Sequence, residues 1–487
     1  MNKDINSKAK KGFKWAASSS IYRAVISAGT TFTLAALLGT EEYGYFALIS
    51  TLITFSTVIA NMGMSQAIIQ EDKLTNTDID TVFWGNILFG TVVGTVVYIF
   101  AKPISLFLGD IAIYNLVRMS AIIFVIHTMS RISAALLQRD LRIKELEKAI
   151  VIEMTIASIV KIICALSGLG AMSFIIGQII GIIILNILLF VYYKKEGNWK
   201  LKLNFSLSSA KKLYKFGMFI ATKSIVNNLG KNIDIIIVSR VVGVESVGIY
   251  HLGKQAIEKA VSIISQVVTR IAYPYFSKIR RSIVDGNYQS LAITYLKLTG
   301  IVSFLGFPFF LGIALFGPEI LPMFFSKEWN AAGIILTILS FKAMIDILSA
   351  GFASSIIYSF GLASLMLYVD LVITPIRIIL LWIGAYFWGI EGVAFAFTIS
   401  VFIKASYLQQ VVNRSINIAW NNYLIVIAKP FFFSILAFIV SKTFLINLNL
   451  FVLSKSIVAG LIYLGIILIL SYLFDKNKIT EVKKIIF

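Results

Sequence analysis

Residues 223–242 read KSIVNNLGKNIDIIIVSRVV, an apolar stretch that carries three cations: Lys223, Lys231 and Arg240. Arg23 lies in a second apolar run nearer the start of the chain. An ionisable group at membrane depth costs roughly 3 kcal/mol on insertion scales. A chain therefore carries many of them only where they face a water-filled cavity, a partner charge or a ligand. Because most of these groups are cations, the pattern indicates a membrane protein with a cavity that handles something anionic.

The composition is that of a helical membrane protein. Apolar residues make up 58% of the 487 positions, and only 14% are charged, whereas soluble domains carry about 25% charged residues. The mean hydropathy is +0.87. Apolar blocks of about 20 residues are long enough to cross roughly 30 Å of hydrocarbon, and they do not alternate as barrel strands would. We therefore predict an all-α integral membrane protein.

The net charge of +20 fits membrane topology better than nucleic-acid binding, which we do not expect. The basic residues are spread over short loops and both tails, where anionic lipid and the positive-inside rule account for them. They fall on alternate loops, so both termini are predicted to be cytoplasmic. The single cysteine, Cys164, excludes an intramolecular disulfide. The basic start of the chain lacks the pattern of a cleaved signal peptide.

Span length and loop punctuation predict about fourteen transmembrane helices. The first twelve are expected at 13–38, 44–69, 80–101, 114–137, 147–167, 171–193, 213–239, 246–272, 291–316, 331–358, 362–386 and 391–412. Two extra helices are expected at 424–443 and 451–473. This count places all the strongly basic loops on the side of the two termini.

An internal repeat divides the chain into two halves. LGTEEYGY at 38–45 follows the first predicted span, and VGVESVGIY at 242–250 follows the seventh. GLGAMSF at 168–174 and GIEGVAF at 389–395 follow the fifth and eleventh. Six spans separate the copies, so both halves keep one orientation, which is a transporter arrangement. The predicted domains are an N-terminal six-helix lobe at 1–193, a cytoplasmic basic linker at 194–212, a C-terminal six-helix lobe at 213–412, two extra helices at 424–473 and a cytoplasmic basic tail at 474–487.

Several segments resemble a known family. They are LLGTEEYG at 37–44, MGMSQAIIQ at 62–70 and DTVFWGN at 80–86, followed in the second half by NID at 232–234 and SRVVG at 239–243. The chain is similar to Wzx-type polysaccharide-export proteins of the multidrug/oligosaccharidyl-lipid/polysaccharide superfamily, in the subgroup that includes the colanic acid exporter and the teichuronic acid protein. The resemblance covers residues 10 to 410, and it is most specific between Gln66 and Asn86.

The resemblance implies a flippase that moves undecaprenyl-diphosphate-linked oligosaccharide across the bacterial cytoplasmic (inner) membrane. The product would be O-antigen, capsule or exopolysaccharide. The family implies two six-helix lobes with pseudo-two-fold symmetry that form a V around a central cavity, with alternating access. The expected partners are the lipid-linked oligosaccharide, the bilayer, and the polysaccharide polymerase with its chain-length machinery. The protein is expected to act as a monomer.

Polar stripes on three predicted helices are placed to line such a cavity. Lys223, Asn227, Lys231 and Asp234 share one face of the seventh span, at spacings of three and four residues. Arginine suits bidentate phosphate binding, and lysine acts as a point charge. The predicted substrate-binding residues are the cations Arg23, Lys223, Lys231, Lys259 and Arg270, and the polar side chains Asn227, Gln255 and Gln266.

Carboxylates at membrane depth are the candidates for coupling to H⁺ or Na⁺, since they can titrate with substrate. They are Glu153, Asp234, Glu258, Asp346 and Asp370. Structural explanations compete with this role. Lys342 and Asp346 are spaced to neutralise each other, and Lys404, near a span end, would snorkel or pair with an acid. Asp370 and Arg377 flank Pro375 and fit a gating element or a packing defect equally well.

Motifs of ATP hydrolysis, zinc proteolysis and serine hydrolysis are absent from the sequence. With only His127 and His251 available, neither a metal site nor a cofactor is expected. Energy would come from an ion gradient, the membrane potential or substrate flux. The alternatives are a multidrug-cation antiporter or a lipid II flippase of the same superfamily. A membrane polymerase or ligase is disfavoured because the predicted outer loops at 102–113 and 317–330 are short.

Overall fold

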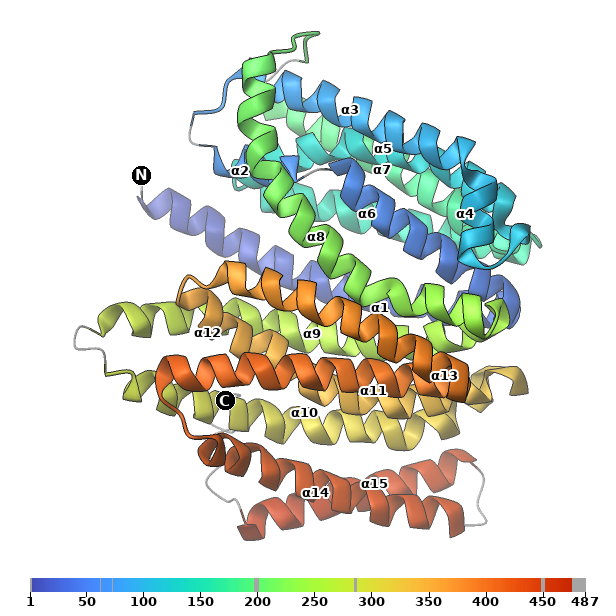
Figure 1. The fold of residues 1–487 in the computed structure, drawn as a ribbon, viewed down its shortest axis with the longest axis vertical. Helices are drawn as coiled ribbons and strands as arrows, with labels where there is room; N and C mark the ends of the chain where they lie inside the picture. Colours follow the sequence, from blue (N-terminus) through green and yellow to red (C-terminus); the bar gives the residue numbers. More distant parts are fainter. Residues whose placement is uncertain are drawn as a thin grey trace. The chain divides into compact units, whose positions relative to one another are not determined.

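The computed structural model describes residues 2–61, 63–71, 73–196, 201–283, 287–447 and 452–474, and every regular element within them is helical (Figure 1). Ten of the described helices are long and apolar enough to cross a membrane. The prediction of an all-α membrane protein is therefore confirmed. The helices are α1 (Asn2–Asn61), α2 (Met64–Gln70), α3 (Asn76–Ile99), α4 (Ala101–Leu108), α5 (Tyr114–Arg139), α6 (Ile143–Leu166), α7 (Met172–Glu196), α8 (Leu207–Val241), α9 (Val244–Ser282), α10 (Gln289–Phe324), α11 (Asn330–Leu348), α12 (Ser354–Ser359), α13 (Ala363–Ile416), α14 (Trp420–Asn447) and α15 (Val452–Phe474).

Two of these helices are each broken by a kink. In α1 the break is at Gly39, where φ is 73°, a value that glycine adopts without the steric penalty of a side chain. In α13 the break lies at Trp388 and Gly389. The sequence predicted a boundary between two spans near each of these positions. α8 and α9, of 35 and 39 residues, are long enough to cross a membrane but are not among the ten. The number fourteen stays a prediction.

The chain forms two compact units, residues 1–251 and 252–487. In the first unit, α6 packs against α7 and α1, α3 packs against α5, and α8 packs against α1, α2 and α3. One core of this unit gathers Met64, Ile68, Val82, Leu136 and Leu189, all of which are fully or almost fully buried. The inward faces of α2, α3, α5 and α7 supply these side chains.

In the second unit, α10 packs against α11 and α14, α11 packs against α13, and α14 packs against α15. Its core includes the buried Phe276, Tyr295, Phe352 and Val412. The Tyr295 hydroxyl donates a hydrogen bond of 2.6 Å to Oε1 of Gln409, which satisfies a polar group that would otherwise be costly inside the bundle.

The predicted lobe boundaries stay a prediction. The boundary between the two units falls within α9, between residues 251 and 252. Helix α8, which begins the second half of the repeat, packs within the first unit. This division describes packing in one conformation, whereas the lobes were inferred from sequence repeats. Residues 475–487 of the predicted basic tail lie outside the described residues.

The stretch that carries the most specific resemblance holds part of the predicted linker. Oδ1 of Asp80 accepts a hydrogen bond of 3.2 Å from the Lys202 backbone N–H. Oγ1 of Thr81 accepts one of 3.0 Å from the Ser206 backbone N–H. The indole N–H of Trp84 donates to the Lys202 carbonyl at 3.0 Å. The start of α3 therefore fixes the segment that leads into α8.

Candidate functional site

Arg23 of α1 pairs with a carboxylate that the sequence prediction missed. Its Nη2 lies 3.3 Å from Oε2 of Glu147 on α6, and the two side chains are 28% and 12% exposed. The Ser19 hydroxyl donates to the same oxygen at 2.5 Å, and Nη2 also donates to Ser20 Oγ at 3.3 Å. Glu147 is the first residue of the predicted span 147–167, and the sequence analysis gave it no role. The predicted cation is thus partly accessible and already faces one carboxylate.

The predicted stripe on α8 runs from exposed to buried. Lys231 is exposed, Lys223 and Asn227 are half-buried, and Asp234 is fully buried. The Tyr250 hydroxyl donates a hydrogen bond of 2.7 Å to Oδ2 of Asp234. The spacing of the stripe is as predicted, but its last member is part of the packed interior of the first unit. A substrate-binding role for the other three stays a prediction.

The predicted stripe on α9 is described only in part. Gln255 and Lys259 are half-buried. The side chains of Gln266 and Arg270 lie outside the described residues. Their predicted roles, like those of Gln255 and Lys259, stay predictions.

The second unit contains a cluster of charges from α9 and α11. Oε1 of Glu258 lies 3.9 Å from Nζ of Lys254 and 3.8 Å from Nζ of Lys342. Nζ of Lys342 also lies 3.1 Å from Oδ2 of Asp346. The Lys254 and Lys342 side chains are 2% and 7% exposed, whereas Glu258 and Asp346 keep 34% and 22%. The predicted neutralisation of Lys342 by Asp346 is confirmed, and Glu258 extends it into a network.

Three cations make cation–π contacts with one aromatic ring. Nζ of Lys254 and Nζ of Lys342 lie 5.4 Å and 4.7 Å from the centroid of Phe397 on α13, and the Arg377 guanidinium carbon lies 5.0 Å from it. Nε of Arg377 donates to Ser400 Oγ at 2.9 Å. Desolvated cation–π contacts contribute up to about 2 kcal/mol each. We call Lys254, Glu258, Lys342, Asp346, Arg377 and Phe397 the Phe397 cluster.

The remaining predicted carboxylates have separate environments. Oδ1 of Asp370 lies 2.5 Å from Nζ of Lys404, which confirms that this lysine pairs with an acid. Arg377, two turns from Asp370, is instead held by Ser400 and Phe397. Glu153 is half-buried in α6, while Lys161 on the same helix donates to Gln178 Oε1 at 3.1 Å. The coupling roles of these carboxylates stay predictions.

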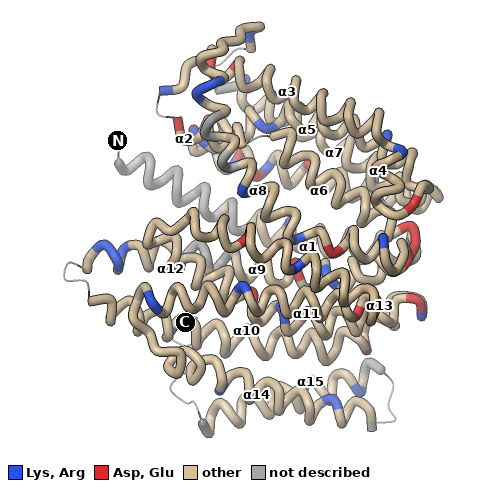
Figure 2. Tube along the Cα trace, viewed as in Figure 1, with Lys and Arg blue, Asp and Glu red and all other residues tan. Residues whose placement is uncertain are grey.

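Charged residues lie both near the ends of the helices and at interior positions of several long helices (Figure 2). Among the described side chains, no group of three or more His, Cys, Asp or Glu is arranged to hold a metal ion. The coupling ion, H⁺ or Na⁺, stays a prediction.

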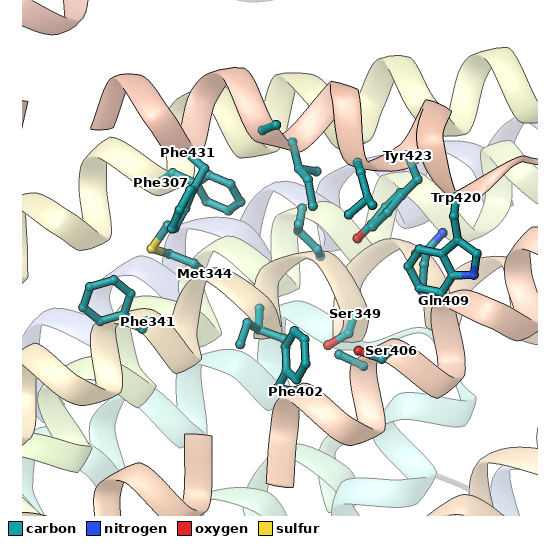
Figure 3. Close-up of a pocket in the computed structure, with 16 residues that line it drawn as sticks. Phe307, Phe341, Met344, Ser349, Phe402, Ser406, Gln409, Trp420, Tyr423 and Phe431 are labelled. Atoms are coloured by element: carbon teal, nitrogen blue, oxygen red, sulfur yellow. The ribbon is translucent and has the colours of Figure 1, made fainter. Parts of the chain in front are cut away.

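An apolar pocket of about 470 Å³ lies between α10, α11, α13 and α14 in the second unit. Figure 3 shows Phe307 and Phe431 toward one end of it, and Tyr423, Trp420 and Gln409 toward the other. Sequence reasoning missed this pocket because apolar residues in a span look the same whether they face lipid or a cavity.

The chain matches the family model described as "Polysaccharide biosynthesis protein" over residues 33–334. It is 26% identical over 368 residues to the teichuronic acid biosynthesis protein TuaB of Bacillus subtilis, covering 75% of this chain and 74% of that one. It is 22% identical over 450 residues to the lipopolysaccharide biosynthesis protein WzxC of Escherichia coli, covering 90% and 87%. These matches confirm the resemblance seen in the sequence.

Two solved structures share the fold. The lipid II flippase MurJ, in an inward closed conformation, superposes with a TM-score of 0.78 at 16% identity, covering 96% of this chain and all of that one. An inward-facing multidrug resistance MATE family transporter gives a TM-score of 0.60 at 14% identity, covering 81% and 98%. At these identities the likeness shows the fold alone. It confirms the predicted all-α fold class.

Proposed function

Because the chain belongs to the polysaccharide biosynthesis protein family, we propose that it is a flippase for undecaprenyl-diphosphate-linked oligosaccharide. It would act in the bacterial cytoplasmic membrane, with both termini in the cytoplasm, and would supply units for O-antigen, capsule or exopolysaccharide. The relatives whose names mention teichuronic acid, lipopolysaccharide, amylovoran and succinoglycan support a surface polysaccharide as the end product. The family and the transporter fold argue against an enzyme.

One observation carries the proposal: Arg23, in an apolar run of α1, is a partly accessible guanidinium beside the Glu147 carboxylate. A diphosphate cannot cross hydrocarbon unaided because its charge would be desolvated. Arg23 can exchange Glu147 for two phosphate oxygens, since guanidinium geometry matches carboxylate and phosphate equally well. Ser19 and Ser20 would then hold Glu147 and orient Arg23. Lys223 and Lys231, with their polar neighbour Asn227, would extend the anion path along α8.

The apolar pocket supports a lipid-linked substrate rather than a free sugar. Its lining of Phe307, Met344, Phe402 and Phe431 offers a prenyl chain a protein surface as apolar as lipid. Gln409 and Trp420 at the other end would tolerate a polar head group. A hydrophilic sugar would gain nothing from such a lining.

Coupling and partners are the finer parts of the proposal. Glu258 is the carboxylate best placed to respond to H⁺ or Na⁺, because it is the most exposed acid of the Phe397 cluster and faces two lysines. A polysaccharide polymerase and its chain-length machinery would receive the product. The protein would work as a monomer.

Two alternatives belong to the same superfamily. The MurJ-like fold is equally compatible with lipid II, which shares the diphosphate and the prenyl chain. A multidrug-cation antiporter is the weaker alternative, because the buried cations of the Phe397 cluster would repel an organic cation.

The test is translocation in proteoliposomes. The purified protein is reconstituted with a fluorescent undecaprenyl-diphosphate oligosaccharide, with lipid II, or with an ethidium gradient. We expect the oligosaccharide to cross and Arg23→Gln to slow it about tenfold, as expected for losing one charge-assisted contact. Arg118→Gln, at a half-buried arginine near the start of α5, is the matched control. Ethidium efflux without movement of either lipid would overturn the proposal, and movement of lipid II alone would transfer the protein to that substrate.

A further inference from the structure

The two copies of the sequence repeat meet each other in the first unit. The first copy is the segment 39–46, GTEEYGYF, and the second is 243–250, GVESVGIY. Each copy opens with a glycine at positive φ, 73° at Gly39 and 114° at Gly243. The first copy continues into the second half of α1, and the second copy continues into the start of α9. Similar sequences thus place a glycine at positive φ before a helical segment twice.

Their contact is reciprocal. A Cβ added at Gly44 would overlap the carbonyl oxygen of Val244, and a Cβ added at Gly248 would overlap the carbonyl oxygen of Thr40. In the alignment of the copies, Thr40 matches Val244 and Gly44 matches Gly248. Exchanging the two copies therefore maps one close approach onto the other, which is the property of a local two-fold axis. Gly44 and Gly248 have no side chain at these points, and small residues allow helices in a membrane to approach this closely.

Further contacts fix the same end of the α8–α9 turn. The Ser239 hydroxyl donates to the Leu108 carbonyl at 2.5 Å, and Nη1 of Arg240 donates to the Leu106 carbonyl at 2.9 Å. Both carbonyls belong to the last turn of α4, where backbone acceptors have no i+4 partner within the helix. The Thr40 hydroxyl lies 3.4 Å from Oε1 of Glu245.

We infer that segments 39–46 and 243–250 form a seam that closes the outer end of the protein and must part for release of substrate outside. The inference rests on the proposed function for its direction, since the proposed topology places this end away from the cytoplasm. The repeat is then more than a trace of duplication, because it supplies both faces of the closure. The contacts of Gly44 with Val244 and of Gly248 with Thr40 involve uncharged backbone. They can separate without leaving a buried charge behind, as a contact that opens in every transport cycle requires.

The first experiment cross-links the seam. In a Cys164→Ser background, Thr40→Cys with Glu245→Cys is joined by a short bismethanethiosulfonate reagent. We expect rapid cross-linking, loss of translocation of the fluorescent undecaprenyl-diphosphate oligosaccharide, and recovery on reduction. Tyr98→Cys with Arg118→Cys, which joins α3 to α5 within one half, is the control that should stay active when cross-linked. Failure of the seam pair to cross-link, or full translocation by its cross-linked form, would overturn the inference.

The second experiment needs no substrate, so it separates failure of the seam from failure of the proposed flippase function. Thr40 is 5% exposed, so Thr40→Cys in the Cys164→Ser protein in nanodiscs should react slowly with a membrane-impermeant maleimide. Adding Gly248→Ala should raise that rate about tenfold, because overpacking disfavours the closed seam. Gly29→Ala, on the same helix as Gly44, is the control, because a Cβ there meets nothing within 4 Å. Equal labelling in the two alanine variants would contradict the seam.

Discussion

The two units hold their intramembrane cations in different ways. In the first unit, Arg23 faces Glu147 at 3.3 Å and keeps 28% of its side chain exposed. In the second, Lys254 and Lys342 are almost completely buried, share Glu258 and lie against Phe397 together with Arg377. An accessible cation with a replaceable partner can bind an anionic ligand. A buried network with several mutual contacts holds helices in place, because breaking it strands charges in a medium of low dielectric constant.

The largest effect is expected at the centre of the Phe397 cluster. Lys342→Met removes the cation that faces both Glu258 and Asp346. The free energy of unfolding should fall by about 3 kcal/mol, at the low end for a broken buried pair because the two carboxylates keep some exposure. Thermal unfolding of the purified protein in detergent measures the change.

Lys442→Met is the matched control, since this lysine is an exposed cation on α14. The double variant Lys342→Met/Asp346→Leu should recover part of the loss. If Lys342→Met unfolded at the wild-type temperature, the buried charges of the second unit would not stabilise the protein, and the proposed difference between the two units would be wrong.

Phe397→Leu tests the role of the aromatic ring in the Phe397 cluster. The leucine side chain is still apolar, but it has no ring face for the cations to contact. The three cations lose their cation–π contacts, so the free energy of unfolding should fall by about 1–2 kcal/mol. Phe395→Leu, two residues away and 57% exposed, should have a much smaller effect. Equal destabilisation by the two leucine variants would mean that the ring does not organise the cations.

The smallest effect is expected outside the membrane spans, where Nζ of Lys212 lies 2.8 Å from Oε1 of Glu71. The hydrogen bond from Lys212 holds the pKa of Glu71 below its ordinary value of 4.5. Any stability from this pair is therefore present above about pH 4.5 and lost as the pH falls through the lowered pKa.

Because the pair is exposed, Lys212→Gln should leave thermal unfolding unchanged at pH 7. A pronounced shift in the unfolding temperature at pH 7 would show that exposed pairs also matter to the packing of this protein.

The sequence predicted what depends on local pattern, and it missed what depends on neighbours distant along the chain. Apolar length predicted the helices, and i, i+4 spacing predicted the pair of Lys342 with Asp346. The pairing of Arg23 with Glu147 joins residues more than a hundred positions apart, so no spacing rule finds it. Phe397 looks like any lipid-facing phenylalanine until three helices bring cations to its face. The repeat was visible in the sequence, but the contact between its copies was not.

The most direct test of the account is the affinity of three proteins in nanodiscs for undecaprenyl-diphosphate-linked oligosaccharide: wild type, Arg23→Gln and Glu147→Gln. If Arg23 exchanges its carboxylate for the diphosphate, Arg23→Gln should weaken binding about tenfold, as expected for one charge-assisted contact. Glu147→Gln should strengthen binding, because the competing carboxylate charge is gone. Unchanged affinity in both variants, or equal weakening in both, would contradict the account and leave the pair as a structural contact between α1 and α6.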